Sequence, residues 1–341
     1  MNRYWEEVAQ LASDHSTAYR FSSVLEHPGL YGKASKRLVR AWIKRVVYPA
    51  QVKMSARGGI AHVLDHSYAH MLAYVPRRTA KVVTLHDLIP LRESEGLSPA
   101  SLAGFWKRVG FLREADMIVA VSAHSKREAV ELLGIDPLRI HISPNGVRRY
   151  SHNESSTSPH VGSEPYILSV GSTLRRKRLD LLPEILREAR RTIPDMKLVR
   201  VGNSLPTSLV SDIRKVGGDT VLEQRGIVND LELDSLYRNA HALILTSSHE
   251  GFGLPVLEAM ARGCPVVSTN TTSLPEVGGD AVLYFDIDQP SEAAAQLIRL
   301  AEDPSLRQSM ISAGLSRSGE FTWDRHFNGL LEAYDLALAG R

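Results

Sequence analysis

Short apolar runs alternate along this chain with longer segments in which apolar residues recur at helical spacing. The short runs span residues 61–64, 81–85, 117–121 and 139–142 in the first half, and residues 166–170, 197–201, 242–245, 265–268 and 281–285 in the second. Runs of this length are typical of buried strands, and their alternation with helical segments is typical of parallel sheets with crossover helices. The pattern predicts an α/β protein with two Rossmann-like, doubly wound domains.

A polar segment without periodicity separates the two sets of runs. It extends from Arg148 to Pro159, is rich in serine, and is typical of a domain linker. The length of 341 residues and the 43% of apolar residues suit two cores of about 150 residues each. We expect a first domain over residues 1–150, a linker over 151–163, a second domain over 164–320, and a C-terminal helix over 321–341 that packs back toward the first domain.

The N-terminus begins with a helical pattern rather than a strand. Apolar residues recur there at helical spacing, and the next apolar run suggests a second strand at Tyr19–Leu25; the recurring residues are Tyr4, Trp5, Val8, Leu11 and Ala12. Doubly wound nucleotide-binding domains usually open with a central strand and a glycine-rich turn, which have no counterpart here. We therefore expect either that the first domain lacks its first strand or that translation starts upstream of Met1.

Membrane-spanning and secretory segments are not indicated by the composition. The chain contains no run of 18 uncharged apolar residues, and its N-terminus lacks the apolar core of a signal peptide. We therefore expect a cytoplasmic protein. The single cysteine, Cys264, can form no internal disulfide and is predicted to be a small buried residue.

Positive charge is concentrated in the first half of the chain. No acidic residue lies between Glu26 and Asp65, whereas eight basic residues do: Lys33, Lys36, Arg37, Arg40, Lys44, Arg45, Lys53 and Arg57. A basic amphipathic helix can lie on anionic lipid, gaining about 1 kcal/mol per basic residue. We expect residues 33–57 to contact an anionic surface on the inner face of the cell membrane; a solvated helix packed on its own domain, or a groove for an anionic acceptor, fits the same pattern. Nucleic acid is not expected, because no aromatic RNA-binding motif or zinc finger accompanies the charge.

Two carboxylates flank a glycine turn in the second half of the chain. Glu250 and Glu258 are separated by Gly251, Gly253 and Pro255, between two strand-like runs. The glycines allow close approach of a ligand, and Pro255 suits the first turn of a helix, whose N-terminus attracts phosphate. A ligand with phosphates and hydroxyls, such as a nucleotide-sugar, fits this arrangement. The alternative is that Glu250 caps the helix and Glu258 is a solvated helix residue.

This stretch, together with residues 261–267 and 274–279, resembles the donor-site signature of retaining glycosyltransferases of family 4, also called glycosyltransferase group 1. Further matches follow in the order that the family has them: residues 86–87, 121–126, 144–147, 170–177 and 226–230, with Leu236, Tyr237 and Ala240. The resemblance covers roughly residues 60–335. It implies the GT-B fold, in which an acceptor-side first domain and a nucleotide-sugar-binding second domain face a cleft, and a hexosyltransferase-type activity (EC 2.4).

The resemblance also implies roles for individual residues. Arg176 and Lys177 would bind the donor diphosphate, Glu250 the transferred sugar and Glu258 the ribose hydroxyls. His86, at the end of the run 81–85, would lie close to the donor sugar and the reacting bond. The remaining donor contacts would come from the backbone or from the base-binding segment 226–228: Gly171, Ile227, Gly251, Phe252, Gly253 and Leu254.

Two groups of residues have the spacing of metal ligands, but no metal site is expected. Asp286 and Asp288 have the spacing of a metal-binding pair, but they precede Pro290, so capping of the next helix explains them. His62, His66 and His70 are spaced by four, but His62 lies in a strand-like run and no further ligand completes a zinc site. We expect no metal and no cofactor beyond the nucleotide-sugar substrate.

The implied reaction is metal-independent transfer with retention of configuration, by front-side attack assisted by the leaving phosphate. The donor would be a UDP- or GDP-sugar, and the acceptor a glycan, a lipid-linked or a natural-product molecule, in cell-surface polysaccharide synthesis. Residues after the run 61–64 are candidates for acceptor binding: Asp65, His66, Ser67 and Tyr68. The alternatives are a non-catalytic relative that binds nucleotide-sugar or a partner, and a sugar-nucleotide epimerase.

Overall fold

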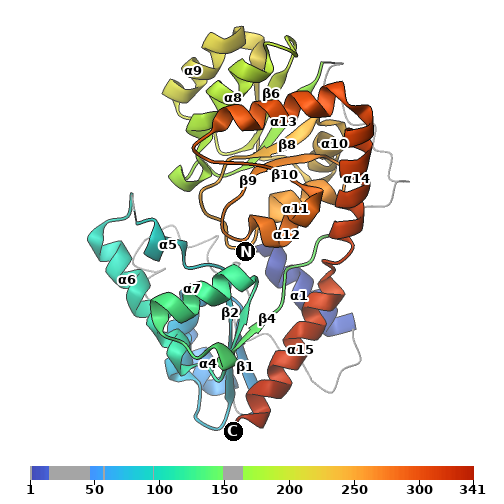
Figure 1. Cartoon of the computed structure of the whole chain (residues 1–341). Helices are drawn as coiled ribbons and strands as arrows, with labels where there is room; N and C mark the ends of the chain where they lie inside the picture. The colour runs from blue at the N-terminus through green and yellow to red at the C-terminus, as the bar shows by residue number, and fades with distance from the viewer. Residues whose placement is uncertain (1, 15–46, 57, 95, 149–163) are drawn as a thin grey trace. The chain divides into compact units, whose positions relative to one another are not determined.

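The computed structural model describes residues 2–14, 47–56, 58–94, 96–148 and 164–341 (Figure 1). The chain divides into two compact units. Unit 1 comprises Met1–Pro144 and Trp323–Arg341, and unit 2 comprises Asn145–Thr322. The linker predicted over 151–163 lies outside the described residues.

Unit 1 contains a parallel four-stranded sheet in the order β1-β2-β3-β4. Its strands are β1 (Ile60–Val63), β2 (Ala80–Leu85), β3 (Met117–Ala120) and β4 (Ile140–Ile142). The strands predicted at residues 61–64, 81–85, 117–121 and 139–142 are each confirmed to within one residue at either end. The helices and 3-10 turns (η) are α1 (Asn2–Asp14), α4 (Tyr48–Ser55), η2 (His66–Tyr74), α5 (Ile89–Arg92), α6 (Pro99–Val109), η3 (Gly110–Glu114), α7 (Ala123–Leu133), η4 (Pro137–Arg139) and α15 (Trp323–Ala339).

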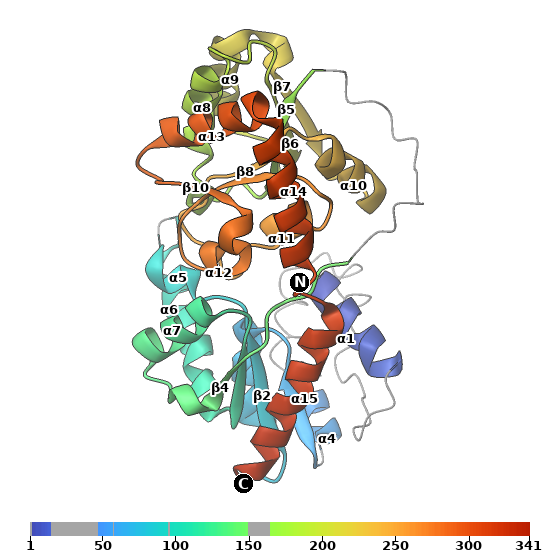
Figure 2. The ribbon, with the colours of Figure 1, turned by 45° about the vertical axis from the view of Figure 1, so that its right-hand side comes forward.

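Helices cover both faces of this sheet, because successive side chains of a strand point to opposite faces. Ala80 and Val82 of β2 pack into a core with α1 and α15, whereas Val83 and Leu85 face a second core with α4, η2, α6 and α7. In both ribbon views α15, coloured red, runs beside α1, coloured blue (Figures 1 and 2). The first and last helices therefore share one layer of unit 1.

The N-terminal helix predicted from the pattern of apolar residues is confirmed as α1, whose Tyr4 and Val8 are buried. The strand predicted at Tyr19–Leu25 and residues 33–46 of the basic segment lie outside the described residues. The described remainder includes α4, where Tyr48 and Val52 are buried while Lys53 and Met54 are exposed. Among the described residues the first strand is β1, at one edge of the sheet.

Unit 2 contains a parallel six-stranded sheet in the order β10-β9-β8-β5-β6-β7. Its strands are β5 (Tyr166–Gly171), β6 (Lys197–Gly202), β7 (Leu222–Gly226), β8 (Ala242–Leu245), β9 (Val266–Thr269) and β10 (Leu283–Phe285). Four of the five predicted strands are confirmed to within one residue. The fifth was predicted too long, because Gly279–Ala281 forms a 3-10 turn before β10.

The prediction missed β7. Only its first residue, Leu222, is strongly apolar, because β7 is an edge strand whose Glu223, Gln224 and Arg225 are at most partly buried. Charged edge strands are common, since they discourage pairing with another chain. A search for apolar runs cannot detect such a strand.

The helices of unit 2 lie on both faces of its sheet. Leu182, Ile185 and Leu297 of α8 and α13 join one core with Ile167 of β5, while the Tyr166 hydroxyl donates a hydrogen bond to Leu236 O of α10 on the other face, at 2.7 Å. The elements are η5 (Arg175–Lys177), η6 (Leu179–Leu181), α8 (Leu182–Ala189), α9 (Thr207–Gly217), η7 (Asp219–Val221), α10 (Asp230–Asn239), α11 (Leu254–Met260), α12 (Leu274–Gly278), η8 (Gly279–Ala281), α13 (Pro290–Glu302) and α14 (Pro304–Ser318).

The order of strands in unit 2 reverses between β5 and β8, which makes this the topological switch point of the sheet. Ligands of doubly wound sheets bind beyond the carboxyl ends of the strands at such a point.

Cys264 is buried, as predicted, and burial raises the pKa of its thiol to about 12. Within the described part of the chain, every helix is too short or too polar to cross a membrane.

Candidate functional site

Two loops meet at the switch point of unit 2. The first follows β5, whose last residue, Gly171, has a φ of 129°, and leads into η5 with Arg176 and Lys177. The second follows β8 and contains Glu250. Since β5 and β8 are adjacent parallel strands, their carboxyl ends bring together residues that are 73 positions apart in sequence.

Glu250 is the centre of a buried cluster of charged and polar side chains. Its carboxylate accepts a hydrogen bond from the Lys177 ammonium group at Oε1 and one from Arg176 Nη1 at Oε2, the latter at 3.1 Å. Ser247 Oγ donates a further bond to Oε1 at 2.7 Å. Both Glu250 and Lys177 are only 7% exposed. The predicted site residues of these two loops are therefore in direct contact.

The charge state of Glu250 follows from its neighbours. Burial alone would raise the pKa of this carboxyl group, but the charges of Lys177 and Arg176, with the hydrogen bonds from Lys177 and Ser247, hold its pKa below the ordinary value. Glu250 is thus a carboxylate at neutral pH. It can accept hydrogen bonds from hydroxyl groups but cannot donate one.

The backbone of Glu250 is held as firmly as its side chain. Its N–H donates to Thr272 Oγ1 at 3.0 Å, and its carbonyl accepts a hydrogen bond from Ser273 Oγ at 2.9 Å. Ser247, Thr272 and Ser273 belong to the site although no motif in the sequence marks them. The only signal was the density of Ser and Thr after both β8 and β9.

Glu250 does not cap the following helix. Helix α11 starts at Leu254, and its N-cap is Gly253, with a φ of 100°. The capping alternative for Glu250 is therefore wrong. Phe252 is buried and packs edge-on against Phe321 at a centroid distance of 5.9 Å, Gly251 is half-buried, and Leu254 is exposed.

Glu258 lies just over one turn inside α11 and contacts α10. The Tyr237 hydroxyl donates to Glu258 Oε2 at 3.0 Å, so the interpretation of Glu258 as a solvated helix residue is wrong as well. Burial, and then the Glu258 carboxylate, raise the pKa of Tyr237 well above its ordinary value, which keeps the phenol protonated as a donor. Ile227, in the turn between β7 and α10, is 93% exposed.

His86 follows β2 in unit 1, as predicted. Its Nε2 lies 2.9 Å from Leu64 O, so this nitrogen carries the proton and Nδ1 does not. Burial, followed by the effect of His66, lowers the pKa of His86, so the ring is neutral at pH 7. The ring packs edge-on against Tyr4 of α1 at a centroid distance of 4.8 Å.

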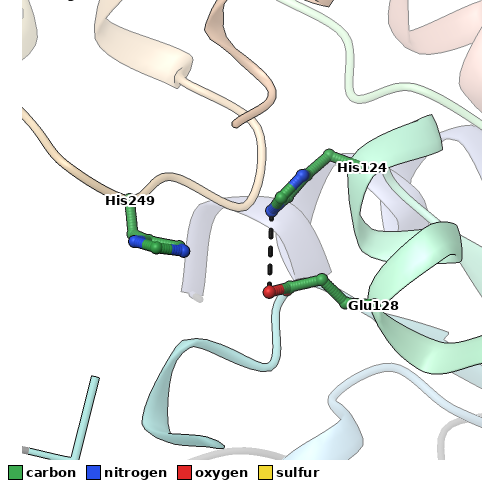
Figure 3. Close-up of side chains that lie close together, drawn as sticks. All are labelled: His124, Glu128 and His249. Atoms are coloured by element: carbon green, nitrogen blue, oxygen red, sulfur yellow. Dashed lines mark ion pairs between the residues drawn. The ribbon is translucent and has the colours of Figure 1, made fainter. Parts of the chain in front are cut away.

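Helix α7 supports the backbone of His86. Ser125 Oγ donates to His86 O at 3.1 Å, one turn from Glu128, which is 2% exposed. Glu128 Oε1 lies 3.4 Å from Arg92 Nε and 3.7 Å from His124 Nε2, the second pair being shown in Figure 3. The contact with Arg92 fixes α7 against α5 in unit 1, whereas the contact with His124 lies within α7.

The residues considered for acceptor binding are partly engaged within their own loop. Asp65 caps η2 by accepting a hydrogen bond from Ser67 N at 2.8 Å, and His66 is buried, where its Nδ1 accepts the His86 N–H at 3.4 Å. Tyr68 stacks on His70 at a centroid distance of 6.3 Å. The side chains of Asp65 and His66 therefore hold the loop and the backbone of His86 in place.

The aspartates and the histidine with metal-ligand spacing have other hydrogen-bond partners. Asp286 Oδ1 accepts the Asp288 N–H at 2.9 Å, and Glu292 reaches back to Asp286 N at 3.0 Å. The N-cap of α13 is Gln289, so the expected capping by the aspartates is wrong: Asp286 closes a turn before the helix. His62 uses both ring nitrogens, on Tyr334 at 2.8 Å and on Thr84 at 2.9 Å.

Comparison with known proteins agrees with this arrangement. Residues 152–317 match the family model described as Glycosyl transferases group 1, and residues 40–149 match that of Glycosyltransferase Family 4. O-antigen chain mannosyltransferase B of Escherichia coli is 40% identical over 111 residues, 33% of this chain and 29% of that protein. A D-inositol 3-phosphate glycosyltransferase of Segniliparus rotundus is 27% identical over 282 residues, 76% of this chain and 61% of that protein. The chain thus spans less than two thirds of the length of these relatives.

Solved structures show the same fold. HepE of Anabaena, in complex with UDP and glucose, superposes with a TM-score of 0.70 at 18% identity, over 84% of this chain and 80% of HepE. Sucrose-phosphate synthase of Thermosynechococcus elongatus gives a TM-score of 0.68 at 19% identity, over 89% and 77% of the two chains. With two Rossmann-like units and both family models matched in order, the chain belongs to the group 1 glycosyltransferases of family 4, which have the GT-B fold.

Proposed function

We propose that this protein is a retaining, metal-independent glycosyltransferase that moves a sugar from a UDP- or GDP-sugar to a glycan, lipid-linked or natural-product acceptor. The observation that carries the proposal is the buried cluster of Glu250, Lys177 and Arg176 at the switch point of unit 2. Buried charges are costly unless they are paired, and an anionic ligand at this position would gain from the two cations.

Each residue of the cluster has a distinct chemical part in the proposed reaction. Cleavage of a glycosyl phosphate develops negative charge on the leaving diphosphate, which Lys177 and Arg176 would neutralise as the bond breaks. The Glu250 carboxylate would accept hydrogen bonds from hydroxyls of the transferred sugar. The neutral His86, with Nδ1 unprotonated, would accept a hydrogen bond from the sugar or the acceptor. The acceptor hydroxyl oxygen would attack the sugar carbon on the face from which the phosphate leaves, and the hydroxyl proton would pass to the departing phosphate oxygen.

The nucleoside would bind along α10 and α11. The Glu258 carboxylate, which accepts a hydrogen bond from Tyr237 at Oε2, would also accept hydrogen bonds from the ribose hydroxyls. The exposed Ile227 would pack against the base. Gly171 and the backbone of Gly251, Phe252, Gly253 and Leu254 would surround the phosphates. The UDP bound to HepE supports this class of donor, and the O-antigen mannosyltransferase supports a role in cell-surface polysaccharide synthesis.

Donor hydrolysis tests the proposal. A panel of UDP- and GDP-sugars is incubated with the full-length protein and with Glu250→Gln, and release of the nucleoside diphosphate is measured. We expect one donor to be hydrolysed, with a loss of about 100- to 1000-fold in the variant, as for removal of a preorganised contact. Binding of UDP or GDP without hydrolysis or transfer would contradict the proposal and favour a non-catalytic relative.

Metal independence is tested separately. We expect hydrolysis and transfer to continue in excess EDTA, because the proposed diphosphate contacts are made by side-chain cations and backbone N–H groups. Complete loss that magnesium restores would contradict this part of the proposal and would direct attention to Asp286 and Asp288.

We also propose that the protein is cytoplasmic and binds peripherally to an anionic membrane through residues 33–57. Support comes from the eight basic residues of this segment and from the exposed Lys53 and Met54 of α4. Sedimentation with vesicles tests it: binding is expected with 30% anionic lipid, about 1 kcal/mol weaker per basic residue changed to Gln. Equal binding to neutral vesicles would contradict it.

A further inference from the structure

Arg200 is a buried arginine in the strand next to the candidate site. It lies on β6, is only 1% exposed, and donates its hydrogen bonds to backbone carbonyls alone. Nη1 bonds to Ser169 O at 3.0 Å and to Val201 O at 2.7 Å, and Nη2 bonds to Gly171 O at 2.5 Å and to Ser172 O at 2.9 Å. The guanidinium therefore underlies the end of β5 and the loop that leads to Lys177.

Arg200 has no counter-charge within the described ranges of the chain. No ion pair there involves it, and its buried Nε has no hydrogen-bond partner. Burial lowers the pKa of Arg200 to about 10, so the group remains charged at neutral pH. Burying a charge without a counter-charge is unfavourable, so a negatively charged ligand close to Arg200 would offset part of this cost.

The charge of Arg200 acts on the candidate site. After the larger effect of burial, the positive charges of Arg176 and Arg200 contribute to lowering the pKa of Lys177, against the effect of Glu250. Arg176, Lys177 and Arg200 are thus three cations near a single carboxylate, that of Glu250. This carboxylate already forms ion pairs with Lys177 and Arg176. The local imbalance is positive and suits a ligand with more than one negative charge.

Arg200 also fixes the direction of the loop backbone. Gly171 O points at Gly202 of β6 so closely that a Cβ on Gly202 would lie 2.0 Å from this oxygen. The C=O and N–H of a trans peptide point in opposite directions, so the Ser172 N–H points away from β6. The strand on that other side of β5 is β8, which leads to Glu250.

We propose that Arg200 is a positioning residue for the diphosphate of the donor. It turns the carbonyls of Gly171 and Ser172 inward, so that the loop presents N–H groups to the diphosphate, and it adds a buried positive charge beneath the loop. This inference rests on the proposed function, because it assigns Arg200 to the same donor site. The ligand it specifies is the diphosphate group, whatever the base or the sugar.

The test uses inorganic pyrophosphate, UDP and GDP as ligands of the full-length protein. Affinities are measured by calorimetry for the native sequence, Arg200→Met, Arg200→Lys, Lys177→Met and a matched control, Arg307→Met. Arg307 also binds backbone carbonyls, with Nη1 2.6 Å from His241 O and Nη2 3.3 Å from Ala240 O, but at the amino end of β8, the opposite end of the sheet.

We expect Arg200→Met to weaken the binding of all three ligands by the same factor, about 10- to 100-fold, by analogy with groups that orient the side chains binding a metal ion. Arg200→Lys keeps the positive charge but lacks the several N–H donors of the guanidinium group, so the loss of affinity should be smaller in this variant. The KM for the donor should rise in step with the pyrophosphate Kd. Arg307→Met should lower the unfolding temperature and leave all three affinities unchanged.

Other outcomes overturn the inference in distinguishable ways. If Arg200→Met lowers the unfolding temperature but binds pyrophosphate as the native protein does, Arg200 is a structural residue only. If Lys177→Met weakens binding and neither Arg200 variant does, the inference fails while the proposed function stands. If the native protein binds none of the three ligands, both fail. Should Arg200→Met not fold, Arg200→Lys against Arg307→Lys makes the same comparison.

Discussion

Glu250, Lys177 and Arg176 are held in place by one another before any donor arrives. Glu250 has two cationic partners, whereas loss of Lys177 would still leave the carboxylate with Arg176 at 3.1 Å. Removing one side of a buried ion pair typically costs about 3 to 5 kcal/mol, because the remaining charge stays buried. Loss of Glu250 should therefore destabilise the fold more than loss of Lys177.

We predict that Glu250→Gln lowers the free energy of unfolding by about 3 to 5 kcal/mol, and Lys177→Met by less. The double variant should be more stable than the sum of the single losses, with a coupling of about 0.5 to 3 kcal/mol. Scanning calorimetry of the four proteins measures this. Additive losses would mean that Glu250 and Lys177 do not depend on each other.

Gly202 provides a second prediction at this scale. Its φ is 119°, and a Cβ there would overlap Gly171 O, whereas Gly218 has a φ of 79° and open space around the same position. Gly218→Ala should therefore cost only the strain of the backbone, about 1 to 3 kcal/mol. Gly202→Ala should lower the free energy of unfolding by more than this. It should also weaken the binding of pyrophosphate at least tenfold, because the loop after Gly171 must move. Unchanged pyrophosphate affinity in Gly202→Ala would show that the loop position does not matter.

Local sequence indicated some of these residues and could not indicate others. Arg176, Lys177, Glu250 and Glu258 lie at the carboxyl ends of predicted strands or at the start of a predicted helix, and the order of the motifs matched a family. Arg200 lies inside an apolar run, where a basic side chain suggests only a strand position near the surface. Its burial depends on four carbonyl partners whose inward direction is a property of the folded loop.

At the scale of elements, α1 and α15 are joined to the sheet of unit 1 by a chain of hydrogen bonds. His326 Nδ1 lies 3.0 Å from Pro144 O and 3.1 Å from Ser143 O, so this nitrogen carries the proton. His326 Nε2 must then accept the bond from the Tyr4 hydroxyl, at 2.9 Å. A neutral His326 thus links α15 to α1 and to the end of β4.

The same logic sets the direction of the remaining bonds. The Tyr4 hydroxyl donates to His326 and so accepts from Thr84 Oγ1, at 3.1 Å. Thr84 must in turn accept from His62 Nε2, at 2.9 Å, and His62 Nδ1 accepts from the Tyr334 hydroxyl, at 2.8 Å. Protonation of either histidine would turn an accepting nitrogen into a donor, so the tyrosine hydroxyl that donates to it would have to give up this bond or turn and accept instead.

Unit 1 should therefore lose stability in mild acid. Burial lowers the pKa of His326 to about 4 and that of His62 to about 3, whereas both are near 6.5 in the unfolded chain. Between these pKa values the unfolded state binds more protons than the folded state. The stability that the two neutral histidines contribute is therefore fully present above about pH 6.5 and falls as the pH drops from 6.5 toward 4. His326 alone accounts for on the order of 3 kcal/mol.

Tryptophan fluorescence can follow this effect in unit 1 alone, because Trp5, Trp42, Trp106 and Trp323 all belong to it. We expect the urea midpoint to fall between pH 7.5 and pH 5, and His326→Asn to be less stable at pH 7.5 but less sensitive to pH. An equal pH dependence in the variant would exclude His326 as the titrating group.

The elements themselves were largely predictable, and the exceptions have physical causes. Strands buried on both faces, such as β3 and β8, appear as uninterrupted apolar runs. The edge strand β7 needs no such run, and the boundary of β10 was obscured by a 3-10 turn that is equally apolar at Ala281. The partnership of α1 with α15 joins residues more than 300 positions apart, as in the Tyr4 to His326 bond, and no local pattern encodes it.

At the scale of the whole molecule, the two units differ in how the chain completes them. Unit 2 is one continuous stretch, Asn145–Thr322, with its own core. Unit 1 needs α15, which fills the core over one face of the sheet with Phe327, Leu330 and Tyr334. Each such side chain contributes about 1.5 to 3 kcal/mol by burial, and their sum is comparable with a net stability of about 5 to 15 kcal/mol.

We therefore predict that residues 145–322 fold alone and that residues 1–144 do not. The first fragment contains every residue proposed to contact the nucleoside and the diphosphate, so it should bind UDP or GDP, and pyrophosphate, within a few-fold of the full-length affinity. It should not hydrolyse the donor, because it lacks His86. Circular dichroism, with thermal unfolding in the presence and absence of each ligand, measures both properties. A folded fragment that binds no nucleoside diphosphate, beside a full-length protein that does, would mean that unit 1 supplies essential donor contacts.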